Sequence, residues 1–476
     1  MKKNFLYNLL YQILILILPL LTMPYVSRIL GASNIGIQSY TYSISYYFAI
    51  CAMLGLNNYG NRTIAKVRDS KDKVSVEFWS IYFFQLIMTL IMIIFYIMYL
   101  YIFEIKYIEI AVIQVINIIA VAFDINWFFF GMEKFKITIT RNVLVKLLSC
   151  IFIFSFVKTS EDINIYALIL ALSVLISNLL LFPFLKKYVN RVNVKFNDIT
   201  KHLKPNLLLF LPVIAVSIYK IMDKIMIGAL STVKEVGYYE NAEKIIHVPT
   251  AIITALGTVM LPRTSNLFSN KKENEIMKLL EKTMPFVMFL TFPMMFGVCV
   301  IAKDFSVIFF GKEFITTGIV IQLLSITIIF LAWGNVIRTQ YIIPKELDKI
   351  YIVSAFLGAI VNFLMNIIFI KKLGAIGACI GTICAEFVVV AYQTFSIRKE
   401  IASLMYLKKS LKFVISSIIM TIIILFVGYL VDSLILRIII QISCGILIYT
   451  LLNYNYIFFE LKIFDSIKRV LGGEKN

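Results

Sequence analysis

The sequence contains few charged residues, few histidines and no regularly spaced cysteines. Only 15% of its 476 residues are Asp, Glu, Lys or Arg, whereas soluble domains carry roughly 25%. Its two histidines and six scattered cysteines have no metal-like spacing, which argues against a zinc site, a haem site or a disulfide framework. The composition therefore excludes an ordinary soluble domain, and we expect no metal and no cofactor.

Long polar segments are also missing. No connection between the apolar runs is longer than about 20 residues. A membrane enzyme such as a polysaccharide polymerase or a glycosyltransferase would show a large extramembrane loop or an acidic metal-binding cluster at the membrane interface. The sequence contains neither, so we do not expect an enzyme.

The chain is instead rich in hydrophobic segments: 60% of its residues are hydrophobic and its mean hydropathy is +0.89. Fourteen apolar segments of about twenty residues each can cross a roughly 30 Å hydrocarbon core as a helix. The sequence therefore predicts an all-α integral membrane protein with fourteen transmembrane helices. Their expected bounds are 5–27, 37–57, 78–103, 107–130, 137–157, 164–185, 206–228, 245–261, 284–302, 314–337, 351–370, 374–395, 411–431 and 434–458.

The 46 Lys and Arg residues are distributed unevenly between alternate loops. Loops on the side of the N-terminus hold 33 of them, the opposite loops hold 10, and Lys146, Lys220 and Lys224 lie within spans. Cytoplasmic loops retain the excess of Lys and Arg, so both termini are predicted to be cytoplasmic. The net charge of +19 is thus explained by topology, and we expect no nucleic-acid partner.

Two similar stretches indicate an internal repeat: "SRILGASNIGIQSYTYS" (27–43) and "DKIMIGALSTVKEVGYYENAEKI" (223–245). The matching positions are Arg28, Gly31, Gly36 and Tyr40 in the first stretch, and Lys224, Gly228, Gly237 and Tyr238 in the second. Spans one and seven share an orientation, so two six-helix bundles are expected at residues 1–190 and 191–400. Residues 401–476 would then hold spans thirteen and fourteen and a cytoplasmic tail.

Four motifs resemble one known family. They are "MPYVSRILGASNIG" (23–36), "DINWFFFGMEKFKITITRNVLVKLL" (124–148), "MDKIMIGALSTVKEVGYYENAEKI" (222–245) and "KKLGAIGACIGTICAE" (371–386). Their order along the chain is similar to that in Wzx-type polysaccharide flippases of the multidrug/oligosaccharidyl-lipid/polysaccharide exporter superfamily. Phe130 departs from that pattern, in which we expect Gln.

This resemblance implies a transporter with two pseudo-symmetric bundles around a central, often cationic cavity, working by alternating access. The implied substrate is an undecaprenyl-pyrophosphate-linked oligosaccharide repeat unit, moved to the outer leaflet of a bacterial cytoplasmic membrane for capsule, O-antigen or exopolysaccharide synthesis. A polysaccharide polymerase, chain-length machinery, and a coupling proton or sodium ion are candidate partners. The alternative is another exporter of the same fold, either a cation-coupled multidrug exporter or a lipid II flippase.

Span seven carries Lys220, Asp223 and Lys224. At about 100° per residue these three side chains share an arc of about 100° on the helix. A charge facing lipid costs about 2.5–3.5 kcal/mol, so this face is expected to point into the protein or a water-filled cavity. Lys220, Lys224 and Arg28 are predicted to bind the pyrophosphate; the alternative is that Lys224 and Arg28 extend to the outer surface.

Other polar residues in the spans have different expected roles. Asp223 is a candidate either for holding Lys220 or Lys224 in place or for ion coupling. Glu386 is a candidate proton or sodium site, and the alternative is a hydrogen bond between packed helices. Asp124 and Lys146 lie near the cytoplasmic ends of adjacent spans, and a structural ion pair between them is expected. Trp127 is expected to be an interfacial anchor.

Overall fold

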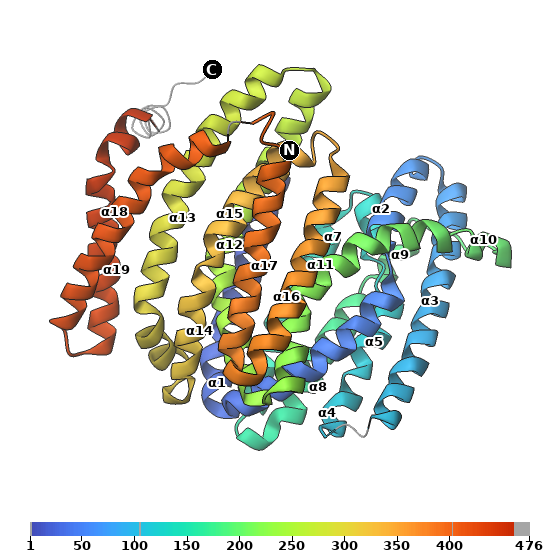
Figure 1. The fold of residues 1–476 in the computed structure, drawn as a ribbon. Helices are drawn as coiled ribbons and strands as arrows, with labels where there is room; N and C mark the ends of the chain where they lie inside the picture. Colours follow the sequence, from blue (N-terminus) through green and yellow to red (C-terminus); the bar gives the residue numbers. More distant parts are fainter. Residues whose placement is uncertain (1, 104–105, 402, 461–476) are drawn as a thin grey trace. The chain divides into compact units, whose positions relative to one another are not determined.

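The protein folds into long helices, as its apolar segments predict (Figure 1). The computed structural model describes residues 2–103, 106–401 and 403–460, excluding the side chains of residues 2–17, 212, 215, 219, 220, 403–405, 407 and 459. Within this part of the chain the regular structure is entirely helical.

Eleven helical segments of the described chain are long and apolar enough to cross a membrane. They match eleven of the expected spans, which confirms a multi-pass helical membrane protein. The other three expected spans, 5–27, 37–57 and 206–228, lie on helices α1 and α11. The total of fourteen stays a prediction.

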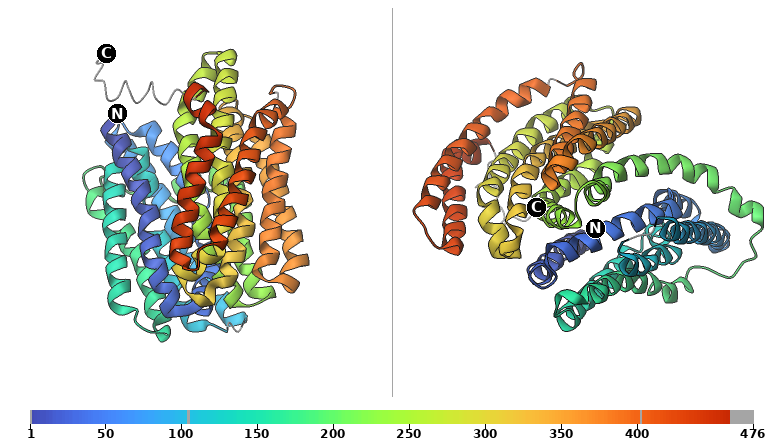
Figure 2. Two further views of the ribbon diagram at one scale, coloured as in Figure 1. Left: turned by 90° about the vertical axis from the view of Figure 1, so that its left-hand side faces the viewer. Right: turned by 60° about the horizontal axis from the view of Figure 1, so that its bottom comes forward.

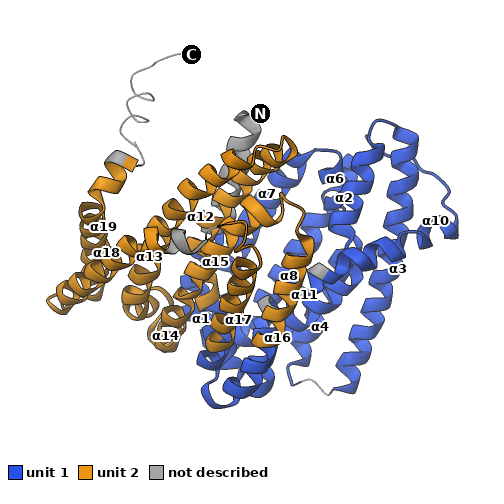
Figure 3. Ribbon diagram, turned by 45° about the horizontal axis from the view of Figure 1, so that its top comes forward, with its two compact units in different colours: residues 1–241, 363–378 blue, residues 242–362, 379–476 orange. Residues whose placement is uncertain are grey.

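The chain is divided into two compact units (Figure 3). Unit 1 comprises residues 1–241 and 363–378, and unit 2 comprises residues 242–362 and 379–476. The predicted division at residues 190 and 400 is not tested by this grouping and stays a prediction.

Unit 1 contains the first eleven α-helices, the short 3-10 helix η1 and the beginning of the twelfth α-helix. In chain order they are α1 (Lys2–Met53), α2 (Leu56–Val67), α3 (Lys71–Ile102), α4 (Ile108–Ile113), α5 (Val115–Ala122), α6 (Asn126–Gly131), α7 (Phe135–Phe156), η1 (Ser160–Asp162), α8 (Ile163–Leu179), α9 (Phe182–Leu185), α10 (Phe196–Thr200) and α11 (Leu203–Leu230). Helices α3 and α7 both pack along α1 (Figure 2).

Unit 2 contains most of α12 (Val233–Ser269) and the helices that follow it. These are α13 (Glu273–Phe310), η2 (Lys312–Phe314), α14 (Ile315–Ser325), α15 (Thr327–Ile337), η3 (Arg338–Ile342), α16 (Asp348–Leu373), α17 (Ala375–Ser396), α18 (Ser403–Tyr429), α19 (Leu434–Leu452) and η4 (Tyr456–Glu460). The end of α16 and the beginning of α17, residues 363–378, belong to unit 1. Helices α18 and α19 pack against each other and against α13.

Helix α1 is interrupted at one residue between the expected spans 5–27 and 37–57. Gly31 has φ 73° and ψ 172°, and helical geometry resumes directly after it. Glycine tolerates this backbone conformation because it has no Cβ. The two expected spans thus join through a single glycine.

The expected span at 107–130 is also broken, between α5 and α6. Gln85 of α3 donates hydrogen bonds to the carbonyl oxygens of Val121 and Asp124, which flank the break. At membrane depth such carbonyl groups need a partner from the protein. One glutamine side chain therefore supports the non-helical residues.

The prediction that Trp127 is an interfacial anchor is wrong. Trp127 is fully buried and packs against Phe78 in the core of unit 1. Its indole Nε1 donates to Gln85 Oε1 at 2.9 Å. Because the indole proton finds this partner in the interior, the side chain does not need the membrane surface.

Candidate functional site

Lys224 of α11 forms a largely buried ion pair with Glu240 of α12. Its Nζ lies 2.9 Å from Glu240 Oε2, and the two side chains are 13% and 14% exposed. The hydroxyl of Ser39, on α1, donates to the same carboxylate oxygen at 2.7 Å. The pair forms because α12 begins three residues after α11 ends, which brings positions 224 and 240 together.

The neighbouring carboxylate, Asp223, accepts hydrogen bonds from two neutral side chains. It is 1% exposed. Tyr239 Oη donates to one of its oxygens at 2.7 Å, and Asn366 Nδ2 of α16 donates to the other at 2.6 Å. Consecutive residues of α12 thus contact consecutive residues of α11.

A third consecutive residue of α12 reaches α1. Asn241 Nδ2 donates to Ser27 Oγ at 3.0 Å, and both residues are buried. Helices α1, α11, α12 and α16 are therefore joined within unit 1 by one group of polar side chains. We call Ser27, Ser39, Asp223, Lys224, Tyr239, Glu240, Asn241 and Asn366 the polar cluster.

The cluster makes the charges of α11 tolerable inside the protein. Two opposite charges that share hydrogen bonds compensate for lost hydration, whereas removing one partner of a buried pair costs about 3–5 kcal/mol. Glu240 therefore compensates the charge of Lys224 inside the protein.

Glycines of the two repeated motifs pack against partners from the other motif. A Cβ on Gly36 would lie 1.6 Å from the carbonyl oxygen of Val233, and one on Gly237 would lie 2.0 Å from that of Ala32. A Cβ on Gly228 would lie 2.2 Å from the Tyr40 ring. These contacts let α1 approach α11 and α12 closely enough for the polar cluster to form.

The other residues of the predicted cation site are placed as follows. The Lys220 side chain lies outside the described residues. Arg28 is exposed on α1, three residues before the break at Gly31. Joint anion binding by Lys220, Lys224 and Arg28 stays a prediction. Glu386 is half-buried on α17 in unit 2, and its coupling role also stays a prediction.

The structure does not bring Asp124 and Lys146 together. Asp124 Oδ1 instead accepts hydrogen bonds from the backbone N and the Nδ2 of Asn126, at 3.0 and 2.6 Å. No ion pair joins Asp124 to Lys146 within the described chain. The reason is local: the break before α6 places Asn126 beside the carboxylate.

Arg141, and not Lys146, is the buried cation of α7. Its side chain is buried on α7, and its NH2 group donates to Asn126 Oδ1 and to Asn142 Oδ1, at 2.9 Å each. Its NH1 group donates to the backbone oxygen of Ser177 on α8. Arg141 is one of the 33 residues counted in the loops on the side of the N-terminus, although it lies inside the expected span 137–157; its burial on α7 corrects that count.

Sequence reasoning missed Glu240, the partner of Lys224. Glu240 lies within the second repeated motif, in the connection 229–244 that the expected spans place in an outer loop. Its distance of sixteen residues from Lys224, across a two-residue turn, was the available signal. Two antiparallel helices joined by a short turn place such residues side by side, which predicts that Glu240 pairs with Lys224.

Buried charges among membrane-length helices define a multi-pass membrane protein with an intramembrane polar site. The chain belongs to the family described as "Polysaccharide biosynthesis protein", which matches residues 1–268. It is 25% identical over 401 residues to a "Putative O-antigen transporter" of Escherichia coli (strain K12), covering 81% of this chain and 94% of the relative. It is also 25% identical over 170 residues to the "Probable low-salt glycan biosynthesis flippase Agl15" of Haloferax volcanii, covering 34% of each chain.

Solved structures with the same fold are distant in sequence. The lipid II flippase MurJ in an inward closed conformation has a TM-score of 0.76 at 17% identity, covering 97% of this chain and 100% of that one. An inward-facing multidrug resistance MATE family transporter of the MOP superfamily has a TM-score of 0.60 at 14% identity, covering 80% and 95%. At these identities the likeness shows the fold alone; the expected family resemblance is confirmed by the family match over residues 1–268 and by the O-antigen transporter relatives.

Proposed function

We propose that this protein is a flippase for an undecaprenyl-pyrophosphate-linked oligosaccharide repeat unit. It moves this lipid from the inner to the outer leaflet of a bacterial cytoplasmic membrane, for capsule, O-antigen or exopolysaccharide synthesis. Family membership and the names of the O-antigen transporter and glycan flippase relatives support this proposal. The MurJ-like fold is compatible with it.

The observation that carries the proposal is the Lys224–Glu240 ion pair. In the proposed cycle, a pyrophosphate oxygen replaces Glu240 at Lys224, and Glu240 returns when the lipid leaves. A lysine ammonium suits this exchange because it is a compact charge on a flexible stem that can follow a moving phosphate. Lys220 and Arg28 contribute further positive charge, while the glycan needs only water and loose hydrogen bonds.

Alternating access then carries the headgroup across the bilayer. Asp223 and Glu386 are the proposed coupling residues. Protonation of Asp223 would weaken the hydrogen bonds that it accepts from Tyr239 and Asn366, and would thereby loosen α11 from α12 and α16. A polysaccharide polymerase and chain-length machinery are the proposed partners that use the exported lipid.

The first test locates the lipid-linked repeat unit in cells depleted of this protein. We expect the repeat unit to accumulate on the cytoplasmic leaflet and to reach the outer leaflet again when the wild-type chain is restored. An unchanged distribution would contradict this substrate. Transport of lipid II or of cationic drugs by the purified protein would then identify the alternative function.

The second test uses matched charge changes. Lys220→Gln with Lys224→Gln should abolish complementation at unchanged membrane abundance. Lys303→Gln with Lys312→Gln is the control, because these lysines carry the same charge but are exposed outside the polar cluster. Full complementation by the first pair would reject the proposed site even if the flippase assignment stands.

A further inference from the structure

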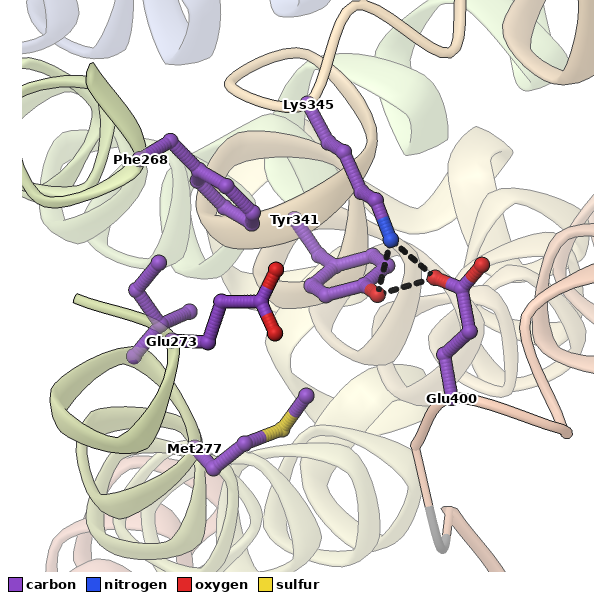
Figure 4. Close-up of a pocket in the computed structure, with 7 residues that line it drawn as sticks. Phe268, Glu273, Met277, Tyr341, Lys345 and Glu400 are labelled. Atoms are coloured by element: carbon purple, nitrogen blue, oxygen red, sulfur yellow. Dashed lines mark hydrogen bonds and ion pairs between the residues drawn. The ribbon is translucent and has the colours of Figure 1, made fainter. Parts of the chain in front are cut away.

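A cavity of about 190 Å³ lies within unit 2, apart from the polar cluster (Figure 4). It is open to the surface, where Glu273 is exposed, and is bordered by the end of α12, the first turn of α13, η3 with the turn after it, and the turn that follows α17. Its lining residues are Phe268, Glu273, Ile276, Met277, Tyr341, Lys345 and Glu400.

On one side of the cavity, the charges of Lys345 and Glu400 cancel each other. Lys345 Nζ lies 2.5 Å from Glu400 Oε2 and 3.0 Å from Tyr341 Oη. Tyr341 Oη also donates a hydrogen bond to Glu400. The bonds from Lys345 and Tyr341 hold the pKa of the Glu400 carboxyl below its usual range. Lys345 and Glu400 therefore contribute no net charge to the cavity.

The remaining charge of the lining is negative and belongs to Glu273. Its carboxylate points into the cavity, toward Tyr341 (Figure 4). Within the described residues Glu273 takes part in no ion pair. Glu275, two residues further along α13, is by contrast paired with Lys272 at 2.8 Å. The cavity thus presents one carboxylate without a protein cation.

Aromatic and thioether groups form the walls around this carboxylate. The rings of Phe268 and Tyr341 meet edge to face, with centroids 5.6 Å apart. Met277 also lines the cavity (Figure 4). Aromatic faces attract ammonium groups through their quadrupoles, and a thioether adds a soft, polarisable contact. A carboxylate among such groups matches an organic cation.

The backbone that carries Tyr341 has an uncommon conformation. Residues Arg338–Ile342 form a π-helix, and Ile343 N donates to the carbonyl oxygen of Arg338, five residues back. Single π-turns are rare and frequently occur at functional sites. Here the π-turn places Tyr341 against Phe268 and Glu400.

The cavity also lies at the level where spans end. Candidate spans of the described chain end at Ser269 and Ile342, and another begins at Glu273. Positions at span ends meet the headgroup region of a bilayer, where organic ammonium groups of lipids are concentrated.

We propose that this cavity binds an alkylammonium group, with Glu273 as its counter-ion and Phe268 and Tyr341 as its aromatic wall. The group would come from an amine-bearing lipid headgroup or from a small soluble amine. This binding site is independent of the proposed flippase substrate. Its occupation would join α12, α13 and η3 at one end of unit 2.

A carboxylate in the first turn of a helix is also favourable for a second reason, because it interacts with the helix dipole. Glu275 shares that property without lining the cavity. The pair Glu273→Gln and Glu275→Gln therefore separates ligand binding from helix stabilisation.

The experiment offers the purified full-length protein equal amounts of phosphatidylethanolamine and phosphatidylglycerol in detergent, and measures retained lipid by native mass spectrometry. We expect preferential retention of phosphatidylethanolamine. Glu273→Gln should weaken its binding about tenfold, as expected for loss of one charge-assisted contact, and Phe268→Leu should also weaken it. Glu275→Gln should retain it at the wild-type level.

A second arm titrates free ethanolamine and choline and follows thermal stabilisation. Glu273-dependent retention of phosphatidylethanolamine supports a lipid source for the ammonium group. Glu273-dependent stabilisation by free amines without lipid preference supports a soluble source. Equal behaviour of wild type and Glu273→Gln in both arms would overturn the site, as would equal losses in Glu273→Gln and Glu275→Gln.

Discussion

At the scale of the residue, polar side chains in the interior are satisfied by specific partners. His202 is an example outside the spans, in the turn before α11. Its Nδ1 lies 2.8 Å from Tyr59 Oη and its Nε2 lies 2.8 Å from Ser80 Oγ. The nearest carboxylate oxygen, on Glu77, is 3.9 Å from Nε2. The ring joins α2 and α3 to the start of α11.

This environment makes stability depend on pH. Burial lowers the pKa of His202 to about 4, against an opposing effect of Glu77. The unfolded chain therefore takes up the proton more readily, so stability is complete above about pH 6.5 and falls as the pH decreases toward 4. Between pH 8 and pH 5 we expect a loss of about 2 kcal/mol, measured by thermal unfolding in detergent.

The chain's other histidine supplies the control. His202→Gln should flatten the pH dependence, whereas His247→Gln should keep it, because the His247 side chain is 61% exposed. Equal slopes in wild type and His202→Gln would show that other groups cause any acid sensitivity.

Residue identity alone predicted only part of the site. Lys224 and Asp223 stood out because charges are costly in an apolar segment, and the structure places both in the polar cluster. Glu240 and Arg141 did not stand out, because each lies near a predicted span end and resembles a loop charge. Their roles depend on neighbours from other helices.

At the scale of the element, the crossing of α1 with α12 depends on glycine. Gly237 packs against the backbone of Ala32, and Gly36 packs against the backbone of Val233. Backbone atoms cannot move aside as a flexible side chain can, so a methyl group at either position must separate the helices.

Gly237→Ala should destabilise the protein by about 1–3 kcal/mol, the usual cost of overpacking. Gly297→Ala is a matched control within α13, because no atom lies within 4 Å of the added Cβ. It should be neutral or stabilise the helix by up to about 1 kcal/mol. Thermal unfolding of both variants measures the difference, and similar effects would contradict the close crossing.

Helix positions were largely predictable, whereas their interruptions were not. Apolar length is sufficient to identify a span. The break at residues 123–125 requires Gln85 from α3, and the single-residue break at Gly31 requires a residue without a Cβ. Hydropathy along one segment contains no information about the partner from α3.

At the scale of the whole molecule, the sequence predicts orientation through its Lys and Arg distribution. That prediction requires α14 and α15 to connect an outer loop with a cytoplasmic loop. Lys312, before α14, and Lys349, in the first turn of α16, are exposed positions on the two sides. Because these two lysines lie at opposite ends of the α14–α15 span, the accessibility of each one shows the orientation of that span.

None of the six native cysteines forms a disulfide, so they can be replaced before single cysteines are introduced. In spheroplasts, Lys312→Cys should react with a membrane-impermeant maleimide. Lys349→Cys should react only after the membrane is permeabilised, because the excess of positive charge keeps its loop in the cytoplasm. The reverse pattern would invert the topology, and it would place the ammonium cavity beside Lys345 on the outer surface. Labelling of both positions in intact spheroplasts would mean that α14 and α15 do not cross the membrane as one span.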